Sequence, residues 1–556
     1  MIALAACPST CATADDVTTH TLLNCLVREV SGPEGQLTLD GHHLIIRLPR
    51  RDVLLRARVR RRSMTGAHRF EGAAQELQRG CWTDAGWRRV AGLVAEELGL
   101  RTGEPNREFV DQVVESHTAM AAGLAAREPG VAIDALDYLA SEQSLVFGHR
   151  FHPTPKGRSG SATQWLPFAP EAGARVRLRH LGVPRELIRE EAIGASPLAA
   201  LDRDHAVLPV HPWQFELLRA HPDLQEALRD GRISDLGEGG GEPTVPTASV
   251  RTLWHPELNV FLKFSLNQRI TNCVRKNADY ELRGAVALTR LLAPVAADLG
   301  RHFPGTTVLA EPAYRTLDLG HRDLVEGFGV IVRDALPVAP GVTPLLAGAI
   351  ADEHPTSPAQ AAALIERGDS DPLDWWRAYL ALVVPPVLHA YFHHGVVFEP
   401  HLQNVVVGVA DDGRPRQVFL RDMEGTKLLP ARHADALRDL PDDVQRQVTY
   451  DAQRGWNRVV YCLIVNHVAE VLAAVADRWP SLECDLWDEV AARLDAYAHE
   501  YGSSPQLRAL LSGVPLPAKA NLLIRWERRA DRHAGYLALP SPFASSRRES
   551  REVAAR

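Results

Sequence analysis

A short loop in the last third of the chain gathers polar side chains between two apolar runs. The segment HAYFHHGVVFEPHLQNVVVG covers residues 389–408, and the predicted strand VFLRDMEG follows at residues 418–425. The polar residues are Glu399, His401, Gln403, Asn404 and, at the end of the strand, Asp422. Carboxylate and amide oxygens are the ligands that Mg²⁺ prefers. The pattern therefore predicts a magnesium site in which Glu399 and Asp422 bind the ion and the two amides supply further oxygens.

The same spacing is similar to the kinase scheme, in which a catalytic loop ends in Asn and an Asp on the next hairpin holds magnesium. The aspartate that serves as the base in that loop is missing here, and His401 stands near its place. A histidine there is suited to stabilising a developing oxyanion. The loop therefore favours chemistry other than phosphate transfer to a hydroxyl, and a small-molecule kinase, which would release ADP, stays an alternative.

A second cluster places cations on a predicted hairpin with strands at residues 249–253 and 260–266. Alternate side chains of a strand share one face, so Ser249 and Arg251 point together, while Lys263 opposes an apolar row and needs a partner. Three more cations, Arg269, Arg275 and Lys276, follow closely. A hydroxyl and several cations on one sheet could hold a triphosphate without a phosphate loop. Solvated surface charge is the other interpretation.

Two further groups could bind anions. The loop FGHRFHPTPKGRSG at residues 147–160 carries His149, His152, Lys156 and Arg158 among prolines and glycines. Metal binding by its histidines lacks a third ligand nearby, so anion binding with the two cations is favoured, and a packed turn is the alternative. Arg458 lies on a predicted helix whose other face is apolar, where it would either bind a substrate carboxylate or cover the helix surface.

Composition excludes several classes of protein. A net charge of −7 offers no basic field for nucleic acid, and the chain has neither a GxxxxGK[ST] nor a GxGxxG motif. The Arg-rich run at residues 56–62 alternates with apolar residues and predicts a solvated strand face. Seven scattered cysteines indicate reduced thiols. No apolar run approaches the roughly 20 residues that a bilayer span requires, and the N-terminus makes a poor signal peptide, so we expect a cytoplasmic protein without a membrane partner.

These groups must be positioned by more than one structural region, because 556 residues exceed one ordinary core. Residues 1–150 have mostly helical patterns with a strand-like insertion at residues 36–62. Residues 151–371 are richer in Pro, Gly and β-branched residues, and predict antiparallel strands with connecting helices. The pattern of residues 372–545 predicts a helix, a short strand and a second helix. The composition of residues 546–556 predicts a disordered tail. The predicted fold class is α+β.

In this order and spacing, the clusters resemble the IucA/IucC family of siderophore synthetases, which work independently of nonribosomal peptide synthetases. The resemblance covers residues 141–467 and rests on GHRFHPTPKGRSG, HPWQ, SVRT, KFSLNQRITNCVRKN and HGVVFEPHLQN. It implies a cupped hand in which the three regions are thumb, fingers and a distantly kinase-like palm, and it implies a homodimer. It also implies that ATP and Mg²⁺ adenylate citrate or a related polycarboxylic acid, and that an amine or alcohol then displaces AMP.

The resemblance also implies roles for individual residues. ATP would be held by His152, Ser249, Arg251, Thr252, Lys263, Arg275, Gln403 and Asn404. Glu399 and Asp422 would lie near the metal, and the carboxylate substrate would face His401, Arg458 and Lys156. Catalysis would depend on His401, Arg275 and Lys263. A second alternative is a siderophore-binding or ferric-reductase protein, but such reductases group C-terminal cysteines on an iron–sulfur cluster, whereas Cys462 and Cys484 stand alone.

Overall fold

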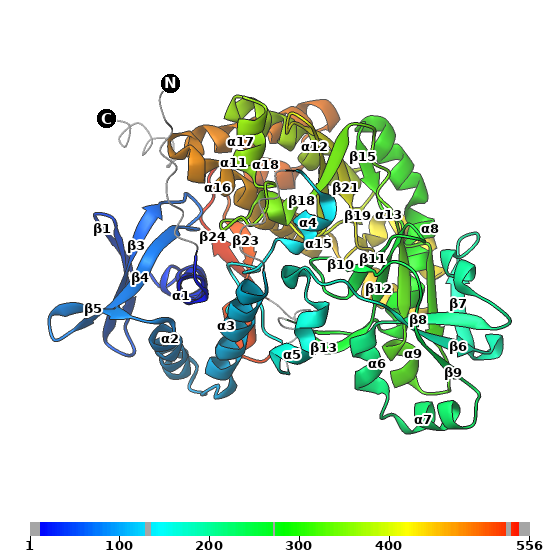
Figure 1. Ribbon diagram of the computed structural model, residues 1–556. Helices are drawn as coiled ribbons and strands as arrows, with labels where there is room; N and C mark the ends of the chain where they lie inside the picture. The colour runs from blue at the N-terminus through cyan, green and yellow to red at the C-terminus, as the bar shows by residue number, and fades with distance from the viewer. Residues whose placement is uncertain (1–11, 128–134, 159, 271–272, 530–534, 544–556) are drawn as a thin grey trace.

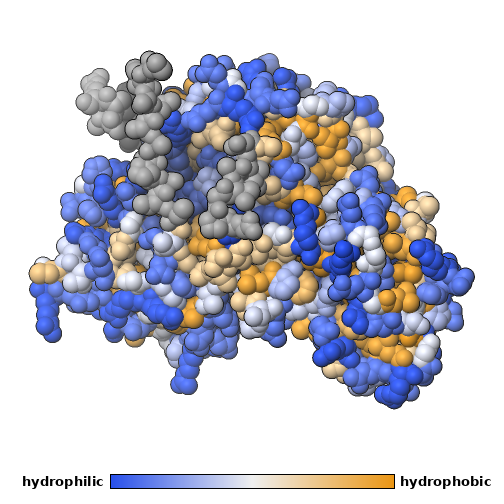
Figure 2. Space-filling view, in the orientation of Figure 1, coloured by the Kyte–Doolittle hydropathy of each residue, from blue (hydrophilic) through white to orange (hydrophobic). Residues whose placement is uncertain are grey.

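The computed structural model describes residues 12–127, 135–158, 160–270, 273–529 and 535–543 (Figure 1). Its element order combines helices with several sheets whose neighbouring strands are mostly antiparallel. The predicted mixture of helices and antiparallel sheets is therefore confirmed. Figure 2 shows that hydrophilic residues cover most of one face, as expected for a chain that is 24% charged.

The N-terminal region is built on a five-stranded antiparallel sheet covered by helices (Figure 1, blue). Its elements are α1 (Ala14–Leu26), β1 (Leu37–Asp40), β2 (His43–Leu48), β3 (Val53–Arg61), β4 (Arg69–Gln78), β5 (Cys81–Ala85), α2 (Trp87–Thr102) and α3 (Glu108–Ala126). The strand-like insertion predicted at residues 36–62 forms, and the sheet continues to Ala85. A late segment, α19 (Asn521–Trp526), places Leu522 and Trp526 in the core of this region.

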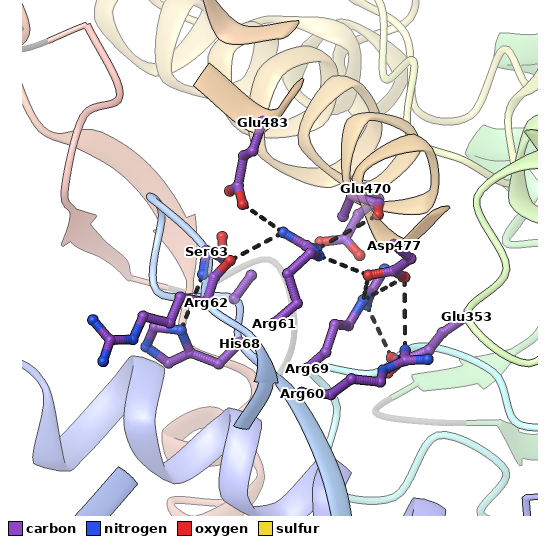
Figure 3. A network of polar contacts seen from close by, with 12 residues as sticks. Arg60, Arg61, Arg62, Ser63, His68, Arg69, Glu353, Glu470, Asp477 and Glu483 are labelled. Carbon is purple, nitrogen blue, oxygen red and sulfur yellow. Dashed lines mark hydrogen bonds and ion pairs between the residues drawn. The ribbon is translucent and has the colours of Figure 1, made fainter. Parts of the chain in front are cut away.

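The arginine-rich strand β3 corrects the prediction of a wholly solvated face. Its odd-numbered residues Leu55, Ala57 and Val59 are buried, and Arg61 continues that face. Figure 3 shows how the Arg61 guanidinium meets Asp477 at 2.7 Å and Glu483 at 2.7 Å. Arg69, which is 0% exposed, meets Asp477 at 2.8 Å and Glu353 at 2.9 Å. The period-2 alternation of β3 places Arg61 inward, and Arg69 lies at the buried start of β4. Arg58, Arg60 and Arg62 are exposed.

The middle region confirms the predicted antiparallel strands. A six-stranded sheet has the order β10-β11-β12-β17-β16-β7, and a three-stranded sheet has the order β8-β6-β9. The strands are β6 (Arg179–Val183), β7 (Ile188–Ala192), β8 (Ala206–Val210), β9 (Ser234–Glu238), β10 (Val245–Pro246), β11 (Thr252–His255), β12 (Val260–Phe264), β16 (Ala313–Leu317) and β17 (Val330–Asp334). The helices include α6 (Pro212–Leu218), α7 (Pro222–Arg229), α8 (Asp279–His302) and α9 (Arg322–Gly327).

The C-terminal region packs long helices on a four-stranded sheet of order β15-β21-β20-β18, in which only the β15–β21 pair is parallel. The strands are β15 (Thr306–Val308), β18 (Val342–Leu346), β20 (Val405–Ala410) and β21 (Pro415–Leu420). The main helices are α12 (Pro372–Phe392), α15 (Ala452–Val459), η6 (Val460–Val468), α16 (Ala469–Arg478) and α17 (Glu483–Tyr501). Trp375, Trp376 and Tyr379 of α12 are fully buried in the core of this region.

One helix of the C-terminal region is long and strongly apolar. Among the described residues, the continuous helix Ala452–Arg478 is long and apolar enough to cross a bilayer, but 89% of its most apolar window is buried inside the protein. The helix is apolar because it packs inside the core of the C-terminal region. The predicted tail at residues 546–556 and the close cysteine pair Cys7 and Cys11 lie outside the described residues.

Candidate active site

A cavity of about 960 Å³ brings every predicted site residue together. Its lining includes His152, Lys156, Ser249, Arg251, Thr252, Lys263, Arg275, Glu399, His401, Gln403, Asn404, Asp422 and Arg458. These residues come from the loop at residues 147–160, called the first loop below, from residues 249–275 and from the C-terminal region. They lie up to 306 positions apart in the chain (458 minus 152). Such a volume suits a nucleotide together with a small acid, because typical ligand cavities hold about 300–1,000 Å³.

The β11–β12 hairpin supplies a buried cation. Thr252 pairs with Lys263 across the hairpin, and the Lys263 side chain is 2% exposed. Its ammonium donates to Asp422 Oδ1 at 2.6 Å and lies 3.0 Å from Glu424 Oε2. The expectation that this lysine needs a partner is therefore confirmed. The first strand begins at Thr252 rather than at residue 249, because Val250 has a φ of 68°, which turns the chain.

Arg251 extends the cationic wall and is itself held in place. One guanidinium nitrogen lies 2.7 Å from Glu424 Oε2, and the other donates to Asn277 Oδ1 at 2.7 Å. Arg275 follows on β14 (Cys273–Arg275) and also lines the cavity. Lys276 faces Asp323 and Glu326, at 3.0 Å and 2.9 Å. The side chain of Arg269 lies outside the described residues.

Asp422 lies just after β21, in a conformation that few aspartates adopt. Its φ is 87°, which stores backbone strain of the kind that often marks functional sites. Burial opposes ionisation, but Lys263 and Arg333 hold the pKa of Asp422 well below its usual range. Burial is likewise outweighed at Glu424, where Lys263 and Arg251 lower the pKa to about 2. Both carboxylates are therefore ionised at neutral pH and can act as oxygen ligands or as partners for cations.

The loop after β19 (Val396–Val397) positions His401 through its own backbone. The Gln403 N–H donates to His401 Nδ1 at 3.3 Å, which places the ring proton on Nε2. Burial lowers the pKa of His401 to about 4, so the imidazole is neutral at pH 7. Asn404, 6% exposed, donates its N–H to the His401 carbonyl at 2.8 Å. A neutral ring of this kind can donate a hydrogen bond but is a weak base.

Arg458 lines the cavity from α15 and is not a helix-surface arginine. Its side chain is 19% exposed, with Nε 3.3 Å from Glu399 Oε1 and a guanidinium nitrogen 3.3 Å from the Tyr450 hydroxyl. Glu399 foremost raises the pKa of Arg458 further above its ordinary value. In this arrangement Glu399 neutralises Arg458, so its predicted place at the metal stays a prediction. Asp422 and Glu424, which share one lysine, form the tighter carboxylate pair.

The first loop is more buried than its composition suggested. His152, Thr154 and Arg158 are each at most 5% exposed. Arg158 lies 2.8 Å from Glu171 Oε1, and Lys156 donates to the Leu145 carbonyl at 2.6 Å. The Thr154 N–H donates to His152 Nδ1 at 3.1 Å. The loop is thus a packed turn that also lines the cavity, and the roles predicted for its residues in binding ATP and the acid stay predictions.

Sequence reasoning missed several residues that shape the site. They are Glu281, Asn277, Glu311, Arg333, Arg421 and Glu424. Glu424 could have been found, because it stands two residues after Asp422 in the same segment. Glu311 and Arg333 could not, because they lie on separate segments and meet at 2.6 Å only in the fold.

Every lysine of the chain lines the cavity. The chain contains five lysines among its 62 Lys and Arg residues. All five line this cavity: Lys156, Lys263, Lys276, Lys427 and Lys519. Lysine is a compact point charge whose pKa shifts readily when it is buried, whereas arginine pairs bidentately through its planar guanidinium. The concentration of ammonium groups in one cavity is what an anionic ligand requires.

Comparisons with known proteins agree with the sequence resemblance. Residues 137–355 match the model of the IucA/IucC family, and residues 373–534 match a model described as ferric iron reductase FhuF-like transporter. The L-2,3-diaminopropanoate–citrate ligase of Staphylococcus aureus is 29% identical over 418 residues, covering 69% of this chain and 71% of that protein. The rhizobactin siderophore biosynthesis protein RhbC of Rhizobium meliloti is 28% identical, covering 93% of this chain and 94% of that protein.

A solved structure agrees over nearly the whole chain. ATP-bound aerobactin synthetase IucA from Klebsiella pneumoniae matches with a TM-score of 0.86 and 25% identity, covering 95% of this chain and 99% of that one. The segment that matches the reductase-like model, residues 373–534, contains only Cys462 and Cys484 as cysteines. Among the described residues, the one group of three or more possible metal ligands contains no cysteine.

Proposed function

The chain belongs to the IucA/IucC family, and we propose that it is an ATP-dependent ligase of siderophore biosynthesis that adenylates citrate or a related polycarboxylic acid and joins it to an amine or alcohol. The observation that carries the proposal is a single cavity with two kinds of anion site. Lys263, Arg251 and Arg275 form a cationic wall for phosphates, and Arg458 with His401 offers a second place for a carboxylate.

The two anion sites answer the main difficulty of the reaction. A carboxylate oxygen must attack the α-phosphorus of ATP, so two anions must be brought together. The P–O bond to pyrophosphate then breaks, giving an acyl-adenylate. Lys263 and Arg251 would stabilise the phosphate charge, while Arg458 would hold the acid and His401 Nε2–H would donate to the carbonyl oxygen as it gains charge. No covalent bond to the enzyme is required.

The residues present fit Mg²⁺. Asp422 and Glu424 are ionised oxygen ligands on one wall, and Asn404 and Gln403 supply amide oxygens in the neighbouring loop. When bound, the ion would neutralise phosphate charge. The ammonium of Lys263 would remain beside these carboxylates and hold them in place.

The second half of the reaction needs a proton acceptor for the incoming amine. Glu281 of α8 lines the cavity, and burial together with the charge of Glu424 raises its pKa to about 7. A carboxyl with that pKa can take the proton of an amine at neutral pH. The amine nitrogen attacks the acyl carbon, the C–O bond to AMP breaks, and the proton passes to Glu281.

Product analysis tests the proposal. The purified chain is supplied with ATP, Mg²⁺ and a panel of citrate, succinate and 2-oxoglutarate, with hydroxylamine as the trapping amine. Pyrophosphate and a hydroxamate that depend on the acid support the ligase. Acid-dependent ADP supports instead the small-molecule kinase, whose scheme the spacing of Asn404 and Asp422 resembles.

We propose a cytoplasmic homodimer without nucleic-acid or membrane partners. Residues 1–150, 151–371 and 372–545 would act as thumb, fingers and a kinase-like palm of a cupped hand. The two substrates would be a small carboxylic acid and a small amine or alcohol, and their exact identities are left to the substrate panel.

A further inference from the structure

A second cluster of titratable groups lies where the C-terminal ends of α8 and α12 meet. On α8, Asp298 and His302 are four residues apart. On α12 and just beyond it, His389 and His393 are also four apart, and His394 follows. Side chains at i and i+4 share one face of a helix, the spacing by which helices present pairs of metal ligands. Two such pairs face each other here, outside the described active site.

The distances within this cluster suit one bound ion. Asp298, His302 and His389 each offer a ligand atom, and the three atoms lie within 4.8 Å of one another. No other group of three or more possible ligand residues this close occurs in the described part of the chain. The Nε2 of His394 lies 2.8 Å from Asp298 Oδ2, and that of His389 lies 3.6 Å from it.

Hydrogen bonding prepares the ligand atoms. The Nδ1 of His302 lies 3.1 Å from the Asp298 carbonyl and 3.3 Å from Asp298 Oδ1, so a proton on Nδ1 leaves the Nε2 lone pair available. His389 is 5% exposed, and its buried Nδ1 has no hydrogen-bond partner within the described residues. Exposed His302 and His393 leave a path for an ion to enter.

We propose that Asp298, His302 and His389 bind one divalent transition-metal ion, with His394 orienting the carboxylate. Two imidazoles and one carboxylate suit ions such as Zn²⁺ or Fe²⁺, whereas Mg²⁺ prefers oxygen ligands throughout. Arg301 lies 2.8 Å from Asp298 Oδ1, but its side chain is 68% exposed, so this ion pair is weak and gives way to a metal.

The site is separate from the cavity but connected to its walls. Glu281, Gly284 and Leu288 of α8 line the cavity, and Leu288 lies ten residues, or about 15 Å, before Asp298. On the other side, α12 is followed by the short strand β19 and then by the loop that carries Glu399. An ion joining the two helices would therefore brace two walls of the cavity.

Metal titration of the full chain, stripped with a chelator, tests this inference. Zn²⁺ binding is followed by calorimetry and Co²⁺ binding by visible absorption, both in excess Mg²⁺ so that oxygen-ligand sites are filled. We expect one equivalent of Zn²⁺ to bind and Co²⁺ to show histidine-ligand absorption bands. D298N and H302Q should abolish this binding, and H394Q should weaken it by about 10–100-fold. H42Q, at an exposed histidine between β1 and β2, should leave it unchanged.

Either of two results would overturn the inference. One is the lack of stoichiometric Zn²⁺ binding by the wild-type chain. The other is a stoichiometric site that survives both D298N and H302Q. Because Asp298 is half-buried and His302 exposed, both variants should fold, and circular dichroism checks this directly. The outcome does not depend on the proposed ligase activity, because the readout is binding alone.

Discussion

Replacing Lys263 by methionine tests the centre of the site. Methionine fits the apolar strand formed by Val260, Leu262 and Phe264 but removes the ammonium that holds Asp422 and Glu424. Breaking a buried ion pair costs about 3–5 kcal/mol. We expect about 3 kcal/mol, at the low end, because Arg251 still lies 2.7 Å from Glu424 and Arg333 lies 3.6 Å from Asp422. Loss of a preorganised phosphate contact should also lower turnover about 100-fold.

The loss of stability should depend on pH with a definite sign. Lys263 lowers the folded-state pKa of both carboxylates, so its contribution to stability is present above their unfolded pKa and disappears as pH falls. For Glu424 the loss occurs between about pH 4.5 and its folded pKa of about 2. Urea unfolding of wild type and K263M should therefore differ most near pH 7 and converge as the pH falls below about 4.

R315M is the matched control for K263M. Arg315 is 1% exposed and meets Glu190 at 2.9 Å and Asp202 at 2.7 Å, but it does not line the cavity. It should cost similar stability while leaving turnover per folded molecule unchanged, measured as pyrophosphate release. Wild-type turnover by K263M, or an equal loss of turnover in R315M, would refute the reasoning.

Four further predictions concern the same cavity. H401Q should lower turnover about 100-fold without changing the pH profile between pH 5.5 and 8, because the pKa of His401 is about 4; an inflection that vanishes with the histidine would contradict this. E281Q should remove a rise in turnover as pH increases through about 7, and a profile identical to wild type would rule out Glu281 as the proton acceptor. R458K should raise the KM for the acid about tenfold with little change for ATP, since lysine cannot pair bidentately; an equal rise for both substrates would count against the assignment. Mg²⁺ and ATP together should protect the lysines that line the cavity from reductive methylation, measured by mass spectrometry of the labelled chain. Lysine labelling that is the same with and without the nucleotide would argue against ATP binding in this cavity.

The sequence predicted the mixture of helices and antiparallel sheets and much of the cavity lining. Residue type and spacing identified the residues that line one cavity, because polar groups such as Glu399 and His401 stand out within apolar runs. The need of Lys263 for a partner followed from its place in a buried strand. Its partner Asp422 lies 159 residues away, and only the fold could show that they meet.

The errors have a physical pattern. Charge in an alternating strand normally faces water, which predicts a solvated Arg61, but Asp477 and Glu483 on other segments pair with its buried guanidinium. For the loop at residues 147–160 the sequence favoured anion binding and kept a packed turn as the alternative, and the ion pair of Arg158 with Glu171 accounts for the packing. In both cases the deciding group is a distant residue, which local patterns cannot reveal.

An oxygen-labelling experiment tests the central claim most directly. The acid that gives pyrophosphate release is prepared with ¹⁸O in its carboxylates and incubated with the chain, ATP, Mg²⁺ and an amine, and the phosphorus products are analysed by mass spectrometry. Attack of the carboxylate on the α-phosphorus predicts one ¹⁸O atom in AMP and none in pyrophosphate. Label in inorganic phosphate together with ADP would contradict adenylation and indicate transfer of the γ-phosphoryl group.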